Sequence, residues 1–222
     1  KALVLSIDKA KIFTEAIKLQ GEIIHGPLLR GFSGYDENIK PYEYNPEEAR
    51  SILDQNGWIE ISVLEYETIL KASSIQTKNT TTSTSTPKFE KETKNIGDTE
   101  TQQKIYRKSG QDILKIKLTT VNIPEYVISA NLIKEFWENI GVVVDLEIIN
   151  EEKIFRDSIK TRNYEAFLYG ENYGSDPDPY PFWHSSQVQE PGLNLSLYSN
   201  RNIDKILEEA KKINKPEEKS NY

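Results

Sequence analysis

Acidic side chains and a histidine gather in one short loop, residues 170–186. Glu171, Asp176 and Asp178 precede His184, and carboxylates beside an imidazole can hold a metal ion or act as acid and base. The Asp-Pro-Asp-Pro run is first of all a turn sequence, because its Asp side chains accept backbone hydrogen bonds and its prolines fix φ. We therefore give Asp176 and Asp178 a structural role in the loop.

The chain lacks the pairing of nucleophile and base that an enzyme needs. His25 and His184 are its only histidines, and a zinc site containing both would require the fold to bring them together. No Gly-rich phosphate loop, Gly-x-Ser-x-Gly or His-Glu-x-x-His motif occurs. We expect no catalytic residues, no metal and no cofactor. The alternatives are a hydrolase that uses Glu171 or Asp178 with His184, and a surface adhesion or scaffold module that uses the Ser- and Thr-rich segment 71–104.

The same loop is rich in aromatic side chains, which offer rigid surface with polar tips and suit a pocket for peptides or sugars. Phe182 and Trp183 could instead anchor the loop to the core. The residues that directly follow the preceding strand are the better candidates for a pocket. The predicted ligand-binding residues are Gly170, Glu171, Asn172, Tyr173 and Trp183.

Alternating strand and helix patterns in the second half of the chain must position this loop. The predicted order is strand 113–121, helix 124–141, strand 142–149, helix 151–162 and strand 164–169. This order is typical of an α/β fold in which right-handed crossovers join parallel strands flanked by helices. Ligands of such sheets bind beyond the carboxyl ends of the strands, where the loop after Tyr169 begins.

Helical spacing of apolar residues places further helices along the chain. The spacing predicts helices over 7–18, with Ser6 or Asp8 as candidate N-caps, and from Pro46 to a stop at Gly57. Residues 202–213 predict a final amphipathic helix. The helix over 151–162 is expected to turn Ile154, Phe155 and Ile159 inward.

An insertion interrupts the middle of the chain. Residues 58–69 alternate like a strand and could pair with 113–121 as a long hairpin. Between them, the segment 71–104 is rich in Ser, Thr and charged residues; ten of the fourteen residues in 73–86 are Ser or Thr. Because such a segment buries too little apolar surface to offset its ordering entropy, we expect a flexible excursion within one domain, 1–222.

Composition excludes several classes of protein. The 28 Lys and Arg against 35 Asp and Glu give a net charge of −7, which argues against nucleic acid and anionic membranes as partners. No run approaches the roughly 18 apolar residues that cross a bilayer. The absence of cysteine excludes disulfides and thiolate metal sites. The absence of methionine and of a secretory signal favours a part of a longer protein.

Four stretches resemble, in order, the extracellular solute-binding proteins of family 5, the oligopeptide, dipeptide and nickel binding group. Ala2–Ile12 resembles the family's "ALxxAIDRxxI" helix, and Gly26-Pro27-Leu28 its "GPI/GPL" loop. Pro41–Trp58 is similar to "PYxYDPEKAKxLLxxAGW". The segment Tyr164–Ser186, with the Asn194, Tyr198-Ser199-Asn200 and Asp204–Ala210 that follow, resembles the C-terminal signature.

The resemblance implies a binding protein and not an enzyme. The chain would be the C-terminal lobe of a monomeric two-lobed protein that captures peptides or a similar small solute and delivers it to the membrane permeases of an ABC importer. Its location would be extracytoplasmic, periplasmic or at the cell surface, with a lipoprotein anchor. Peptide binders of the family commonly hold the ligand's α-ammonium with an aspartate where this chain has Tyr173. A phenol cannot replace that carboxylate, so Glu171 or another acid would take over, or the ligand lacks a free amino terminus.

Overall fold

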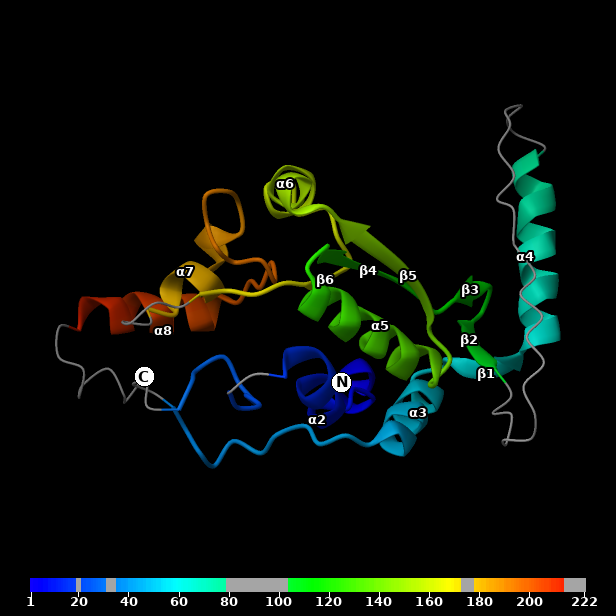
Figure 1. The fold of residues 1–222 in the computed structure, drawn as a ribbon, viewed down its shortest axis with the longest axis horizontal. Coiled ribbons are helices and arrows are strands. Elements are labelled where there is room, and N and C mark those ends of the chain that lie inside the picture. The colour runs from blue at the N-terminus through cyan, green and yellow to red at the C-terminus, as the bar shows by residue number, and fades with distance from the viewer. Residues whose placement is uncertain (19–20, 31–34, 79–103, 173–177, 214–222) are drawn as a thin grey trace.

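The computed structural model describes residues 1–18, 21–30, 35–78, 104–172 and 178–213 (Figure 1). Helices and strands alternate through its second half. In chain order the elements are α1 (Ala2–Leu5), α2 (Lys9–Ile12), η1 (Phe13–Ile17), α3 (Pro46–Gln55), β1 (Ile59–Ser62), α4 (Val63–Lys78), β2 (Ile105–Ser109), β3 (Asp112–Ile113), β4 (Lys115–Val121), α5 (Pro124–Glu138), β5 (Val143–Ile149), α6 (Glu151–Ile154), η2 (Phe155–Ile159), β6 (Ala166–Leu168), α7 (Tyr180–Trp183), η3 (Ser185–Gln187) and α8 (Arg201–Lys212).

A three-stranded parallel sheet organises the second half of the chain, and it confirms the predicted α/β class. Its strand order is β5-β4-β6, with Leu118 of the central strand opposite Leu146 on one side and Ala166 on the other. Helix α5 crosses from β4 to β5, and the α6–η2 segment crosses from β5 to β6 (Figure 1). All three strands therefore point their carboxyl ends to the same edge.

The hydrophobic core lies between this sheet and helices α1, α3 and α5. The α5 stripe is buried as the spacing predicts, with Ala130 and Ile140 fully enclosed and Trp137 7% exposed. The indole N–H of Trp137 donates to the Leu3 carbonyl at 3.1 Å, which ties α5 to α1. Further core residues are Ala2, Leu5, Ala49, Leu53, Leu118, Ile133, Val142 and Val144.

Side-chain caps and glycines set the ends of several helices. Asp8 accepts the Lys11 N–H at 2.9 Å, as predicted, and Asn45 caps α3 in the same way. Gly57 and Gly141 have φ of 79° and 91°, where a residue without a Cβ ends a helix without strain.

The predicted strand over 58–69 is wrong beyond Ser62. Residues 59–62 form β1, and α4 begins at Val63, where Leu and Glu favour helix and the Ser62 hydroxyl accepts the Glu65 N–H. The predicted pairing with 113–121 is wrong as well. Strand β1 pairs antiparallel with β2, whose residues carried no recognised strand signal, and β4 joins the parallel sheet.

The predicted inward position of Phe155 is also wrong, since 53% of its surface is exposed. Ile154 is buried as expected. The five residues from Phe155 to Ile159 form a π-helical turn, and its wider spacing turns Ser158 inward at 1% exposure. Residues 71–78 belong to α4, and the remainder of the predicted insertion, up to residue 103, lies outside the described residues.

Candidate functional site

A cavity of about 680 Å³ lies along β6 and extends beyond its carboxyl end; it is called the cavity beyond β6 below. Three parts of the chain that are distant in sequence line it, namely 24–29, 164–171 and 183–197. The described lining residues are Ile24, Gly26, Pro27, Leu29, Tyr164, Glu165, Phe167, Tyr169, Gly170, Glu171, Trp183, Leu195, Ser196 and Leu197. Only its part at Tyr169, Gly170 and Glu171 lies beyond the strand end, where the strand order predicts a ligand.

The cavity contains three of the five predicted ligand-binding residues: Gly170, Glu171 and Trp183. Asn172 is described but is not part of its lining, and Tyr173 lies outside the described residues. Whether these residues bind a ligand stays a prediction.

Stacked aromatic rings form one wall of the cavity. The Tyr164 and Phe167 centroids are 4.6 Å apart with planes 16° from parallel, and the Phe167 and Tyr169 centroids are 5.2 Å apart at 11°. Tyr126 of α5 extends the stack from Tyr169 at 6.2 Å. The stack keeps these rings rigid, so a ligand would meet a preformed surface.

Gly170 lets Tyr126 approach this wall. A Cβ at Gly170 would stand 2.2 Å from the Tyr126 hydroxyl, so a larger residue would displace the tyrosine. Burial raises the pKa of the Tyr126 phenol, and a backbone hydrogen bond from Gly170 partly opposes that shift. The glycine therefore has a packing role at the base of the cavity.

Glu171 brings a carboxylate to the cavity. Desolvation by its surroundings raises the pKa of this carboxyl, and the Arg162 guanidinium partly opposes the shift. Arg162 donates to the carbonyls of Val188 at 3.0 Å and Gly192 at 2.6 Å, and to that of Ile159. Three of its five N–H donors are thus used by the backbone, and its effect on Glu171 comes from its charge.

The loop after the cavity is held by local hydrogen bonds. Asp178 accepts the Tyr180 N–H at 3.0 Å, which agrees with the structural role expected for it, whereas Asp176 lies outside the described residues. Ser185 donates to Asp204 of α8 through its N–H at 2.9 Å and its hydroxyl at 2.7 Å, and these bonds lower the pKa of Asp204. The loop is therefore bound to α8.

His184 lies in the contact between this loop and α8 and does not line the cavity. It is 6% exposed, its Nδ1 accepts the Ser186 N–H at 3.1 Å, and its ring stacks on Tyr180. Its Nε2 lies 3.4 Å from Glu208. Within the described ranges, no three His, Cys, Asp or Glu side chains gather as a metal site.

Trp183 is half-buried, and its choice between binding a ligand and anchoring the loop stays a prediction. It lines the cavity, and its ring meets Tyr198 edge to face at 6.1 Å. Its indole N–H is buried without a hydrogen-bond partner among the described residues. Phe182, at 8% exposure, anchors the loop to the interior.

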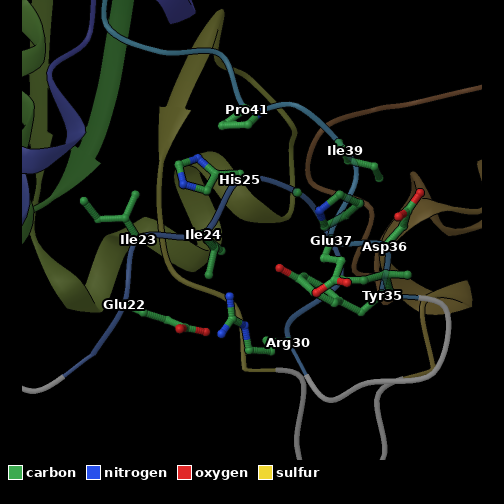
Figure 2. Close-up of a pocket in the computed structure, with 13 residues that line it drawn as sticks. Glu22, Ile23, Ile24, His25, Arg30, Tyr35, Asp36, Glu37, Ile39 and Pro41 are labelled. Atoms are coloured by element: carbon green, nitrogen blue, oxygen red, sulfur yellow. The ribbon is translucent and has the colours of Figure 1, made fainter.

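A second cavity, of about 350 Å³, lies next to the first (Figure 2). Residues 22–30 and 35–41 line it, and Ile24, Gly26 and Pro27 are shared with the first cavity. His25 lines this second cavity, whereas His184 lies in the loop on α8, so the two histidines serve different places. The sequence marked this stretch as irregular by Gly26-Pro27 but gave no sign that it forms a wall.

Comparison with solved structures shows that the fold is that of solute-binding proteins. The oligopeptide-binding protein AppA from Bacillus subtilis, in complex with a nonapeptide, matches 99% of this chain and 36% of its own, with a TM-score of 0.70 and 20% identity. NikZ from Campylobacter jejuni, in complex with Ni(L-His), matches 100% and 36%, with a TM-score of 0.69 and 20% identity. DppA from Helicobacter pylori, in complex with the peptide STSA, has a TM-score of 0.64 and 18% identity, over 99% and 33%.

The chain belongs to the bacterial extracellular solute-binding proteins, family 5. The model of this family, described as "family 5 Middle", matches residues 1–191. In sequence it is 22% identical to AppA of Bacillus subtilis over 216 residues, which is 96% of this chain and 32% of that protein. The chain therefore spans about a third of the length of this relative. Within the part of the chain that the structure describes, no helix is long and apolar enough to cross a membrane.

Proposed function

We propose that this chain is one lobe of the substrate-binding component of an ABC importer, which captures peptides or a similar small solute. The observation that supports this best is the cavity beyond β6, which has a rigid aromatic wall and a carboxylate and is open on one side of a single lobe. A second lobe that closed over it would desolvate the ligand. The full-length protein would be extracytoplasmic, anchored to the membrane, monomeric, and able to deliver its ligand to permease subunits.

The hydrolase alternative has weaker support. Its histidine, His184, is buried against α8, and Asp178 is used by the Tyr180 N–H. Only Glu171 of the proposed acids lines the cavity. The proposed component is accordingly a binding protein without catalytic residues, in agreement with its family.

A binding experiment on the full-length protein tests the proposal. A mixture of short peptides should raise its melting temperature, because a ligand that binds only the folded state stabilises it. Tyr169→Leu, which removes a ring from the aromatic wall, should lower that shift by more than half. Tyr66→Leu is the matched control, since Tyr66 also belongs to a stacked pair but lies away from this cavity. Equal shifts in both variants, or no shift with any peptide, would contradict the proposal.

A further inference from the structure

The cavity beyond β6 combines apolar walls with negative charge. Its described lining contains no Lys, Arg or His and two acids, Glu165 and Glu171. Glu165 accepts the backbone N–H of Lys117 at 2.7 Å and is therefore engaged by the sheet. No hydrogen bond or ion pair engages Glu171 within the described ranges, and the nearby Arg162 directs three of its five N–H donors to carbonyls. Glu171 is thus the carboxylate available to a ligand.

The aromatic wall suits a positive group as well as an apolar one. Tyr164, Phe167 and Tyr169 line the cavity together with Glu171. Aromatic rings attract an ammonium or a guanidinium through their quadrupoles, and the attraction grows when the site is desolvated. Tyr169 and Glu171 are exposed in this lobe, so a bound ligand would itself supply the desolvation.

The adjoining cavity has the same sign of charge. Glu22, Asp36 and Glu37 line it against a single Arg30, which is hydrogen-bonded to Tyr35 (Figure 2). The two cavities together carry five carboxylates and one guanidinium, a formal charge of −4 in a chain whose net charge is −7. The residues that line these two neighbouring cavities therefore account for more than half of the net charge of the chain.

We infer that the cavity beyond β6 binds a lysine or arginine side chain of a peptide ligand, with Glu171 pairing with its cationic head. The inference rests on the proposed function and specifies its substrate class. A long basic side chain fits both features of the cavity, since its apolar stem can lie along Phe167, Tyr169 and Leu197 while its head reaches the carboxylate. The acids of the second cavity would favour a further positive charge along the same ligand.

The test is a titration of the full-length protein with tetrapeptides that differ at one position. Each position of an alanine tetrapeptide is replaced in turn by lysine, norleucine or glutamate, and dissociation constants are measured by calorimetry. At one position lysine should bind about tenfold more tightly than norleucine, which keeps the stem and lacks the charge, and glutamate should bind least. Glu171→Gln should remove the advantage of lysine and leave the affinity for norleucine unchanged. Glu209→Gln, on α8 and outside both cavities, should keep the advantage.

The outcomes separate this inference from the proposed function. If norleucine and lysine bind equally at every position, or if Glu171→Gln keeps the preference for lysine, the inference is wrong while peptide capture stands. If lysine and norleucine peptides bind equally and N-acetylation weakens both alike, the positive group in the cavity is the peptide's amino terminus and the side-chain assignment is wrong. If no peptide binds at all, the proposed function itself fails.

Discussion

Arg107 lies in the interior of the chain with 1% of its surface exposed. Its guanidinium donates to the carbonyls of Ile140 and Trp58, each at 2.7 Å, and it pairs with Asp54. These bonds join β2 to the ends of α3 and α5. Periodicity cannot reveal such a residue, because an arginine in an alternating segment is ordinarily assigned to the solvent face.

Replacing Arg107 with methionine should lower the free energy of unfolding of the full-length protein by about 3 kcal/mol, because two buried carbonyls lose their donors. Urea denaturation measures the loss. The control is Arg156→Met, since Arg156 is exposed and pairs only with its neighbour Asp157. If both variants lose less than about 0.5 kcal/mol of unfolding free energy, the buried bonds of Arg107 do not stabilise the fold.

Gly141 has no room for a side chain. Its φ is 91°, and a Cβ would stand 2.8 Å from Cγ of Arg107 and 3.2 Å from the Tyr106 backbone. Gly141→Ala should therefore cost about 1–3 kcal/mol of stability. Gly26→Ala, where a Cβ would meet nothing within 4 Å, should change stability by less than about 0.5 kcal/mol in the same unfolding assay. Equal effects of the two substitutions would contradict this account.

The ionisation of Glu171 should make the stability of the protein depend on pH. Desolvation raises its pKa above the usual 4.5, so ionisation opposes folding, and stability is lost as the pH rises through the raised value. Glu171→Gln should then stabilise the unliganded protein at neutral pH by less than about 1 kcal/mol, because the carboxylate keeps some solvent. The gain should vanish below about pH 4, where both states are protonated. Thermal unfolding across that range tests the sign, and a variant less stable at neutral pH would contradict it.

At the scale of elements, the sequence predicted those with a strong period. Helix α5, the strand predicted over 142–149 and the amphipathic helix α8 are found close to their expected bounds, because the apolar residues of each follow a clear pattern. The β1–α4 junction was missed, since Leu and Glu after Ser62 fit a strand by alternation and a helix by propensity. The wall at 24–29 was missed because an irregular segment has no period, and only the fold brings it to β6.

The pairing of β1 with β2 predicts the effect of removing the insertion. Ser62 lies opposite Ile105, so the ends of segment 63–104 are neighbours across the ladder and an Asn-Gly turn can join them. With that replacement, the unfolding free energy should stay within about 2 kcal/mol. The Tyr66–Tyr106 stack is lost, while closing a shorter loop costs less entropy.

Peptide titration of the shortened full-length protein completes this test. Ligand affinity should be unchanged, because the described lining of the cavity beyond β6 includes no residue of 63–104. A protein that fails to fold would show that the segment is part of the lobe's structure, and a protein that folds but binds weakly would show that it contributes to capture.

At the scale of the whole molecule, we propose that the chain supplies one wall of a site. It spans about a third of the length of its curated relative. An isolated wall lacks the contacts that desolvate a ligand, so residues 1–222 alone should bind peptides far more weakly than the full-length protein. The order of strands and helices was enough to predict the fold. The identity of the ligand depends on contacts made by side chains from segments that are distant in sequence.

Native mass spectrometry of the full-length protein, purified from its own host beside the chain 1–222, tests the central claim most directly. The account predicts one peptide or similar small solute bound per full-length molecule, a cationic one if the inference on Glu171 holds, and none retained by the chain alone. Stoichiometric retention of a ligand by residues 1–222, or a full-length protein that carries none and takes up none when peptides are added, would contradict it.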